Sequence, residues 1–149
     1  YDILSLDSEG RADAEGVHQS TALLEALVER EVERGIEPDH IVVAGFSQGG
    51  AIAINAVLHS RLKLAGLMAL STYIPLPGEL AASRGNRGLP VFMGHGSFDP
   101  MIQMQWGRAS ADSLAKAGFT VEWHEYPMAH AVCPEEINDI RTWLLNVFS

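Results

Sequence analysis

The spacing of apolar residues along the chain predicts four helices. Over residues 13–35, apolar positions recur every three or four residues, and the segment closes with Arg34-Gly35, which is typical of a helix C-terminus. The apolar face of this helix is predicted to hold Val17, Thr21, Leu24, Leu27 or Val28, and Val32. The other helices are expected after residue 47 to about residue 59, over residues 103–117, and from residue 134 onward, with Ile137, Ile140, Trp143, Leu144 and Val147 on one face.

Between these helices lie short segments with the character of strands. Apolar runs cover residues 41–44, 64–70 and 90–93, and residues 119–126 alternate between apolar and polar side chains. Residues 2–6 give a weaker strand signal, and a short helix is predicted near residues 79–83, in a loop rich in Pro and Gly. Strands that alternate with helices predict a single α/β domain over residues 1–149, with a mostly parallel sheet flanked by helices. In such sheets, functional groups gather beyond the carboxyl ends of the strands.

The first clear strand leads into a motif with chemical meaning. Residues 45–49 read Gly-Phe-Ser-Gln-Gly, the Gly-x-Ser-x-Gly form of a nucleophile elbow, in which a sharp turn lifts the serine above the strand end. We expect Gly45 and Gly49 to leave room for this turn. The following helix directs its first backbone amides at the turn, which prepares the site for negative charge. Ser47 is therefore a predicted nucleophile, with a plain strand-to-helix turn as the alternative.

Composition and charge narrow the classes of function. The net charge of -9 and the lack of a basic stripe argue against a nucleic-acid partner. The single cysteine, Cys133, excludes an internal disulfide and fits a reducing compartment, so a cytoplasmic location is expected. No apolar run reaches the length of an integral membrane segment. The chain opens without Met inside what reads as a folded segment, which suggests the later part of a longer polypeptide.

A serine nucleophile needs a base, and the base needs an acidic side chain that orients it. On a sheet with such an elbow, these partners follow the serine in the order acid, then histidine. Asp99 comes just after the 90–93 strand, whereas Asp112 and Asp139 fall inside predicted helices. An Asp-Pro turn is the structural alternative for Asp99.

The histidine that fits the role of base is His130. It lies in the loop between the last strand and the last helix, whereas His59 ends a helix and His124 lies within a strand. His95 precedes Asp99 by four residues among glycines, so a structural role is expected for it. Ser47, Asp99 and His130 form the predicted catalytic triad.

Four stretches of the chain resemble those of a known family. They are residues 45–51 (Gly-Phe-Ser-Gln-Gly-Gly-Ala), 69–73 (Ala-Leu-Ser-Thr-Tyr), 95–99 (His-Gly-Ser-Phe-Asp) and 126–130 (Tyr-Pro-Met-Ala-His). Together they resemble the carboxylesterase, acyl-protein thioesterase and lysophospholipase family of small α/β-hydrolases, bacterial carboxylesterases above all. The resemblance implies an α/β-hydrolase fold of which this chain is the C-terminal two-thirds.

The chain also departs from the family pattern. Ala129 stands where the family usually has Gly, and Pro-Met-Ile-Gln at residues 100–103 replaces an Asp-x-Val-Val-Pro-like run. The family's early strand and its His-Gly-x-Gly-like loop have no counterpart before the elbow. The backbone N–H of Gln48 is therefore expected to be one oxyanion donor, with the second outside this chain. A homodimer in which a second copy supplies the missing strands is left open.

The predicted function is that of a serine hydrolase. It would cleave carboxylic esters or thioesters of short-to-medium acyl groups through an acyl-enzyme on Ser47, with no cofactor or metal. The alternatives are acyl-protein thioesterase or lysophospholipase activity, a lactonase or peptidase on the same scaffold, and a truncated non-catalytic binding module. Residues near strand ends are predicted to line an acyl groove, with core packing as an equal alternative: Tyr73, Ile74, Leu76, Met101, Ile102 and Trp106.

Overall fold

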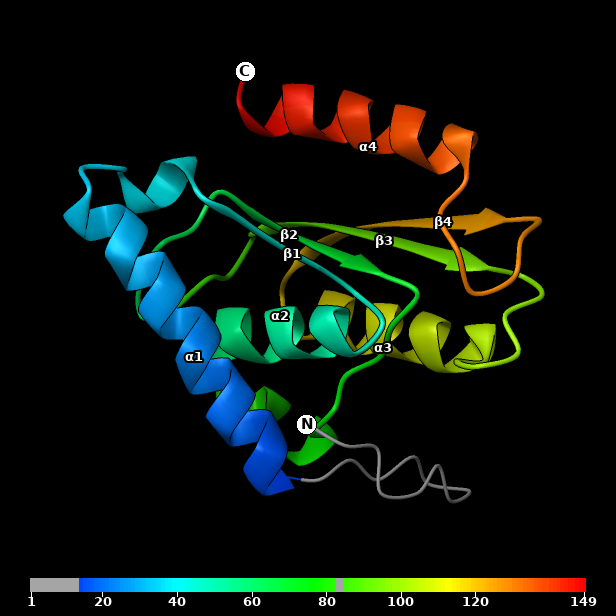
Figure 1. Ribbon diagram of the computed structural model, residues 1–149, viewed down its shortest axis with the longest axis horizontal. Coiled ribbons are helices and arrows are strands. Elements are labelled where there is room, and N and C mark those ends of the chain that lie inside the picture. The colour runs from blue at the N-terminus through cyan, green and yellow to red at the C-terminus, as the bar shows by residue number, and fades with distance from the viewer. Residues whose placement is uncertain (1–13, 83–84) are drawn as a thin grey trace.

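A four-stranded parallel sheet lies at the centre of the computed structural model, which describes residues 14–82 and 85–149 (Figure 1). Its strands, in their order across the sheet, are β1 (Val42–Phe46), β2 (Gly66–Leu70), β3 (Pro90–Gly96) and β4 (Thr120–Tyr126). Each strand pairs in parallel with the next, so all four end at the same edge of the sheet. The prediction of a parallel α/β fold is confirmed. The weak strand signal at residues 2–6 lies outside the described residues.

Helices cover both faces of this sheet. They are α1 (Ala14–Glu33), α2 (Gln48–His59), α3 (Met104–Lys116) and α4 (Pro134–Val147), with short 3-10 helices η1 (Pro38–His40) and η2 (Pro77–Ala82). The first three α-helices lie on one face and α4 on the other (Figure 1). Strands β1 and β3 run further than the apolar pattern predicts, because Gly45-Phe46 and Gly94-His95-Gly96 continue the pairing.

The two faces of the sheet bury separate hydrophobic clusters. The larger one joins α1, α2 and α3 to the sheet, with Ile54, Leu67, Val91 and Leu114 almost fully buried. The smaller one lies under α4 and consists of Leu70, Phe92, Ile140 and Trp143. This division fixes the position of α4, and with it the loop that precedes α4.

The structure decides one open alternative on the predicted helix faces and shows that one detail is wrong. On α1, Val28 packs against the core whereas Leu27 is 58% exposed. On α4, Ile140 and Trp143 are buried as expected, but Ile137 is 56% exposed. Helical spacing allows either side of an apolar stripe to face the sheet, and the packed neighbours decide which side does.

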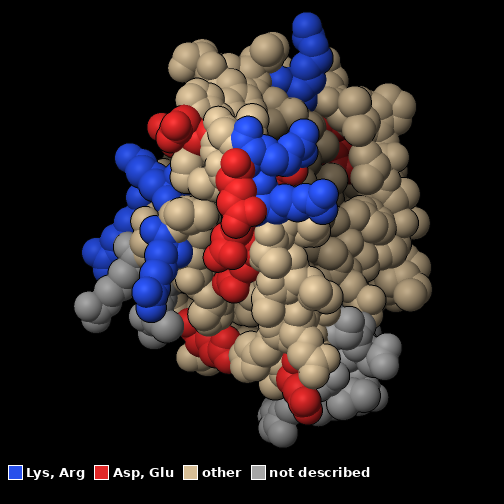
Figure 2. All heavy atoms as spheres, turned by 60° about the vertical axis from the view of Figure 1, so that its left-hand side comes forward, with Lys and Arg blue, Asp and Glu red and all other residues tan. Residues whose placement is uncertain are grey.

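The surface over α1 carries charges of both signs. Figure 2 shows a column of acidic side chains on this face, with Lys and Arg side chains beside it. Among the helices of the described residues, none combines the length and the apolar character that crossing a bilayer requires.

Candidate active site

Ser47 occupies a strained turn between β1 and α2. Its backbone has φ 56° and ψ −121°, a region that residues other than glycine seldom adopt. The end of β2 holds this turn from both sides: the Ser47 N–H donates to the Leu70 carbonyl (2.9 Å), and the Thr72 hydroxyl donates to the Ser47 carbonyl (2.6 Å). Strain of this kind persists only where the surroundings enforce it, and it gathers at functional sites.

The turn depends on close approach of the backbone at Gly45. A Cβ atom at this position would collide with the backbone of Gly49 and Gly50. At Gly49, in contrast, a Cβ atom would meet no described atom within 4 Å. Within the described residues, the expectation that both glycines make room is therefore right for Gly45 and wrong for Gly49, because α2 turns Gly49 outward.

The three predicted triad residues meet above the ends of the strands. The imidazole of His130 lies between Ser47 and Asp99, with Nε2 2.9 Å from Ser47 Oγ and Nδ1 2.6 Å from Asp99 Oδ2. Because a carboxylate only accepts hydrogen bonds, the short contact places the imidazole proton on Nδ1. Nε2 is then free to accept the proton of the serine hydroxyl.

Asp99 is held in its charged form by the loop that follows it. Burial raises the pKa of Asp99, but the backbone N–H of Ile102, His130 and the backbone N–H of Met101 outweigh that effect, so the pKa falls below its usual range. The two amides bond to Oδ1 at 2.9 Å from Ile102 and 2.8 Å from Met101, which leaves Oδ2 for His130. The carboxylate is therefore fixed in both charge and direction.

His95 has a structural role, as predicted. Its side chain is buried, and Nε2 donates to the Ile102 carbonyl at 2.8 Å. This bond supports the loop whose amides bind Asp99. Nε2 also lies 3.5 Å from Asp99 Oδ2, so the buried imidazole of His95 lies beside the carboxylate.

The residue after the predicted nucleophile begins a helix. Gln48 is the first residue of α2, and the first amides of a helix have no acceptor within it. The backbone N–H of Gln48 therefore fits the predicted role of one oxyanion donor.

The residues predicted to line an acyl groove divide into two groups. Tyr73 and Ile102 are buried with Ala51 in a small cluster, against which Trp106 packs. Met101 is 62% exposed beside Asp99. Ile74 is buried in the larger hydrophobic cluster, and Leu76 is half-buried. Substrate binding stays a prediction for all six residues, and for Tyr73, Ile74 and Ile102 the structure shows core packing.

Sequence reasoning overlooked several neighbours of the triad. The ring centroid of Phe46 lies 4.7 Å from that of the His130 imidazole, and the Thr72 hydroxyl donates to the Ser47 carbonyl. Phe98 and Val132, each within two residues of a triad member, are 71% and 41% exposed. The signal for Phe46 and Phe98 was their adjacency to Ser47 and Asp99, whereas nothing in the sequence marks Thr72 as a partner of Ser47.

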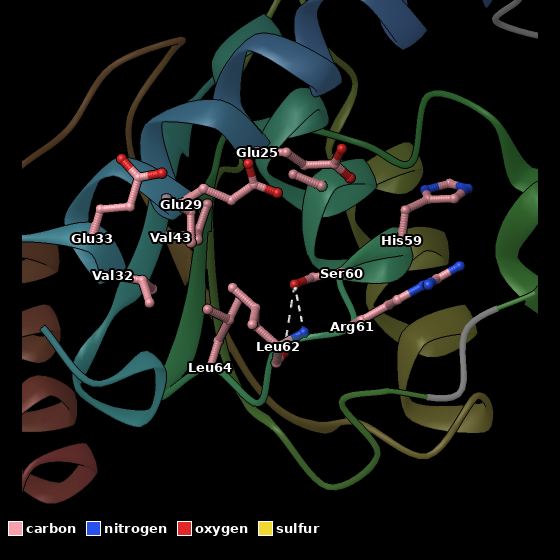
Figure 3. Close-up of a pocket in the computed structure, with 12 residues that line it drawn as sticks. Glu25, Glu29, Val32, Glu33, Val43, His59, Ser60, Arg61, Leu62 and Leu64 are labelled. Carbon is pink, nitrogen blue, oxygen red and sulfur yellow. Dashed lines mark hydrogen bonds between the residues drawn. The ribbon is translucent and has the colours of Figure 1, made fainter. Parts of the chain in front are cut away.

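In the part of the chain that the structure describes, two cavities lie away from the predicted triad. One, of about 580 Å³, lies between α1, α2 and β1 and is lined by Glu25, Glu29 and Glu33 on one side and by His59 and Arg61 on the other (Figure 3). Another hollow, of about 770 Å³, runs along α4 and is lined by residues of α4 and the two residues that follow it. Neither is lined by a triad residue, so neither is the predicted catalytic pocket. The described residues contain no group of three or more His, Cys, Asp or Glu side chains placed to hold a metal ion.

A strained serine at the end of a parallel strand, with a histidine and an aspartate at neighbouring strand ends, defines the α/β-hydrolase class. The chain belongs to the phospholipase/carboxylesterase family, whose sequence model matches residues 1–147.

Individual relatives agree with this assignment. The chain is 36% identical to the acyl-protein thioesterase 1 of Cryptococcus neoformans over 94% of its own length and 66% of that protein. It is also 36% identical to the acyl-protein thioesterase 1 of Neurospora crassa, of which it covers 63%. The chain thus spans slightly less than two thirds of these relatives.

Solved structures show the same fold. The crystal structure of Arabidopsis thaliana SOBER1 matches with a TM-score of 0.87 at 25% identity, over 96% of this chain and 70% of that one. The carboxylesterase of Bacillus cereus matches with a TM-score of 0.80 at 22% identity, over 99% and 68% of the two chains.

Proposed function

We propose that this chain carries the catalytic triad of a serine hydrolase that cleaves carboxylic esters or thioesters through an acyl-enzyme on Ser47. The observation behind the proposal is the continuous contact from Asp99 Oδ2 through His130 to Ser47 Oγ, at 2.6 and 2.9 Å. Such a relay activates a hydroxyl that is otherwise a poor nucleophile. Family membership supports the same class of reaction.

The first half of the reaction acylates the serine. Nε2 of His130 takes the hydroxyl proton while Ser47 Oγ forms a bond to the carbonyl carbon, and negative charge develops on the carbonyl oxygen. The Gln48 N–H is placed to stabilise that charge. When the tetrahedral intermediate collapses, the bond to the leaving alcohol or thiol breaks, and His130 returns the proton to it.

The second half releases the acid. Water attacks the acyl carbon, His130 accepts the proton of that water, and the bond to Ser47 Oγ breaks as the proton returns to the serine. Asp99 keeps its charge throughout and stabilises the imidazolium, in agreement with its lowered pKa. These steps use no cofactor or metal ion.

The apolar surface beside the triad favours a substrate with an acyl chain. Phe46, Phe98, Met101 and Val132 are 39–71% exposed, and each lies within two residues of a triad member. An acyl group bound at Ser47 would remove such surface from water, which yields about 25 cal/mol per Å². We therefore propose short-to-medium acyl chains as substrates.

Thioesters and simple esters are both compatible with this chemistry. The relatives named acyl-protein thioesterase 1 favour thioesters, and the fold shared with a carboxylesterase is equally consistent with esters. Ester and thioester pairs with the same acyl group, from two to about twelve carbons, would separate the two classes by their kcat/KM values.

The test of the proposal is covalent labelling. A fluorophosphonate should add one adduct to the protein, located on Ser47 by peptide mapping, and Ser47→Ala should remain unlabelled. Absence of labelling in a folded protein would reject the hydrolase assignment for this chain and favour the alternative of a non-catalytic binding module.

A further inference from the structure

The loop that carries His130 is fastened unequally on its two sides. Before His130, the backbone is tied to the loop after β3: Ser97 N–H donates to the Tyr126 carbonyl (2.8 Å), and Phe98 N–H donates to the Met128 carbonyl (3.1 Å). After His130, the Ala131 N–H bonds only locally, to the Ala129 carbonyl at 3.0 Å. The placement of the imidazole therefore depends on how the start of α4 is held.

The start of α4 contains a fully buried carboxylate. Glu136 is 0% exposed, whereas its neighbour Glu135 is exposed. Cys133 occupies the N-cap position of α4, but its side chain makes no capping hydrogen bond. A glutamate three residues into a helix is placed to turn back to the backbone N–H of the capping residue. Neither oxygen of Glu136 makes a well-aligned hydrogen bond with a described group, but the Cys133 N–H lies near enough to favour the charged form.

The space for this carboxylate comes from β3. Gly94 has no side chain, and the Glu136 carboxylate occupies the space that a side chain there would fill. A Cβ atom at Gly94 would collide with this carboxylate and approach the Tyr126 ring to 3.2 Å. The Gly94 carbonyl accepts the Ser71 N–H at 2.8 Å. Ser71 is flanked by Leu70 and Thr72, the two residues that hold the Ser47 turn. The buried carboxylate thus packs against the strand ends that support the nucleophile.

We propose that Glu136 is a positioning residue: its buried side chain holds the start of α4 against β3, so that His130 stays between Asp99 and Ser47. This inference rests on the proposed hydrolase function. Misplacement of a catalytic group by about 1 Å can cost about 10²-fold in rate, so the anchor has a measurable effect without touching substrate.

The charge state of the anchor responds to pH near neutrality. Burial raises the pKa of Glu136 to about 7, against the opposing effects of the Cys133 N–H and of His124, and Asp139 raises it further. These groups face the carboxylate from the loop, from β4 and from α4 itself. Tyr126 of β4 also lies there and donates its hydroxyl to Asp139 at 2.7 Å. A charged oxygen attracts the nearby Cys133 N–H more strongly than a neutral one, so the anchor is tighter above this pKa.

The test compares Glu136→Ala and Glu136→Gln with the matched variants Glu135→Ala and Glu135→Gln, all below their unfolding temperatures. We expect Glu136→Ala to lower kcat by about tenfold or more, with KM changed by less than about twofold. Glu136→Gln keeps the shape and an acceptor oxygen. Its kcat should match that of the unchanged protein near pH 5.5 and fall behind it by about threefold or more above pH 7. Both Glu135 variants should behave like the unchanged protein.

The outcomes separate the inference from the function on which it rests. If Glu136→Ala keeps its kcat, or if the kcat ratio of the unchanged protein to Glu136→Gln is flat across this pH range, the positioning role is refuted. Should Glu136→Ala fail to fold, the pH dependence of that ratio decides alone. An unchanged protein that a fluorophosphonate does not label refutes the hydrolase function instead.

Discussion

The ring centroid of Phe46 lies 4.7 Å from the centroid of the His130 imidazole, at an interplanar angle of 45°. Phe46 immediately precedes Ser47, so one strand end both presents the proposed nucleophile and supports the proposed base. Asp99 bonds to one ring nitrogen of His130 and Ser47 to the other, while Phe46 packs against the ring itself. These contacts restrain the imidazole in both position and tilt.

Removal of this ring should slow catalysis without abolishing it. An aromatic pair contributes about 0.5–1.5 kcal/mol beyond buried area, which corresponds to about a 2- to 12-fold change in rate. We expect Phe46→Ala to reduce the rate of fluorophosphonate labelling within this range. Leu23→Ala, which removes a 70% exposed side chain on α1, serves as the control and should label normally. Equal labelling of both variants would show that the ring contact has no part in catalysis.

Asp99→Asn should have a far larger effect. The asparagine oxygen can still accept the N–H groups of Met101 and Ile102, so the loop keeps its shape. Its amide group would then face Nδ1 of His130 and force the imidazole proton onto Nε2, where it blocks transfer from Ser47. We expect kcat to fall by about 10⁴, the loss known for the same change in the triad of a serine protease.

The control for this change is Asp112→Asn, at an exposed position on α3. It should leave kcat unaltered. A loss of less than about tenfold in Asp99→Asn would mean that the carboxylate does not orient the base.

The pattern of apolar residues and the order of motifs were sufficient to predict the sheet and the positions of Ser47, Asp99 and His130. Parallel strands have their carboxyl ends at one edge of the sheet, so residues just after three separate strands lie close together there. The elbow motif set the position of the first residue, and the chain order of the other two followed.

The features that escaped prediction depend on contacts between distant segments. Glu136 reads as an ordinary acidic residue at a helix start, and its burial follows from the empty space at Gly94 on another element. Likewise, Thr72 reaches the carbonyl of Ser47 only because β1 and β2 pair in this register. Ile137 fits the apolar spacing of α4 but lies on a side that no described element covers. Local sequence does not encode which neighbour will face a side chain.

The two outer glycines of the elbow should respond differently to the same change. Gly45→Ala places a methyl group against the backbone of Gly49 and Gly50, and backbone cannot move aside as a side chain can. We expect a loss of about 3 kcal/mol or more in the free energy of unfolding, within the range of overpacked sites. Gly49→Ala meets no described atom and replaces glycine within α2, so it should be neutral or stabilising by up to about 1 kcal/mol.

Urea unfolding of both glycine variants would measure this difference. Comparable destabilisation by the two substitutions would contradict the close approach that is specific to Gly45.

The stability of the protein should fall as the pH rises through neutrality, and Glu136 should account for part of that fall. The pKa of Glu136 is raised from 4.5 to about 7 in the folded state, so the folded protein holds its proton more tightly than the unfolded chain. The resulting stabilisation is complete below pH 4.5 and is lost as the pH rises through 7, by about 3 kcal/mol for a shift of this size. Glu136→Gln stays neutral throughout, so it should be more stable than the unchanged protein above pH 7 and close to it near pH 4.5.

Urea midpoints measured across this pH range would test the prediction, with Glu135→Gln as the exposed control. Parallel curves for the unchanged protein and Glu136→Gln would show that folding does not raise the pKa of the Glu136 carboxyl. Together with the expected loss of kcat above pH 7, a more stable Glu136→Gln would mean that the charged carboxylate costs stability and improves the placement of His130. A site retained at a cost in stability is expected where geometry serves catalysis.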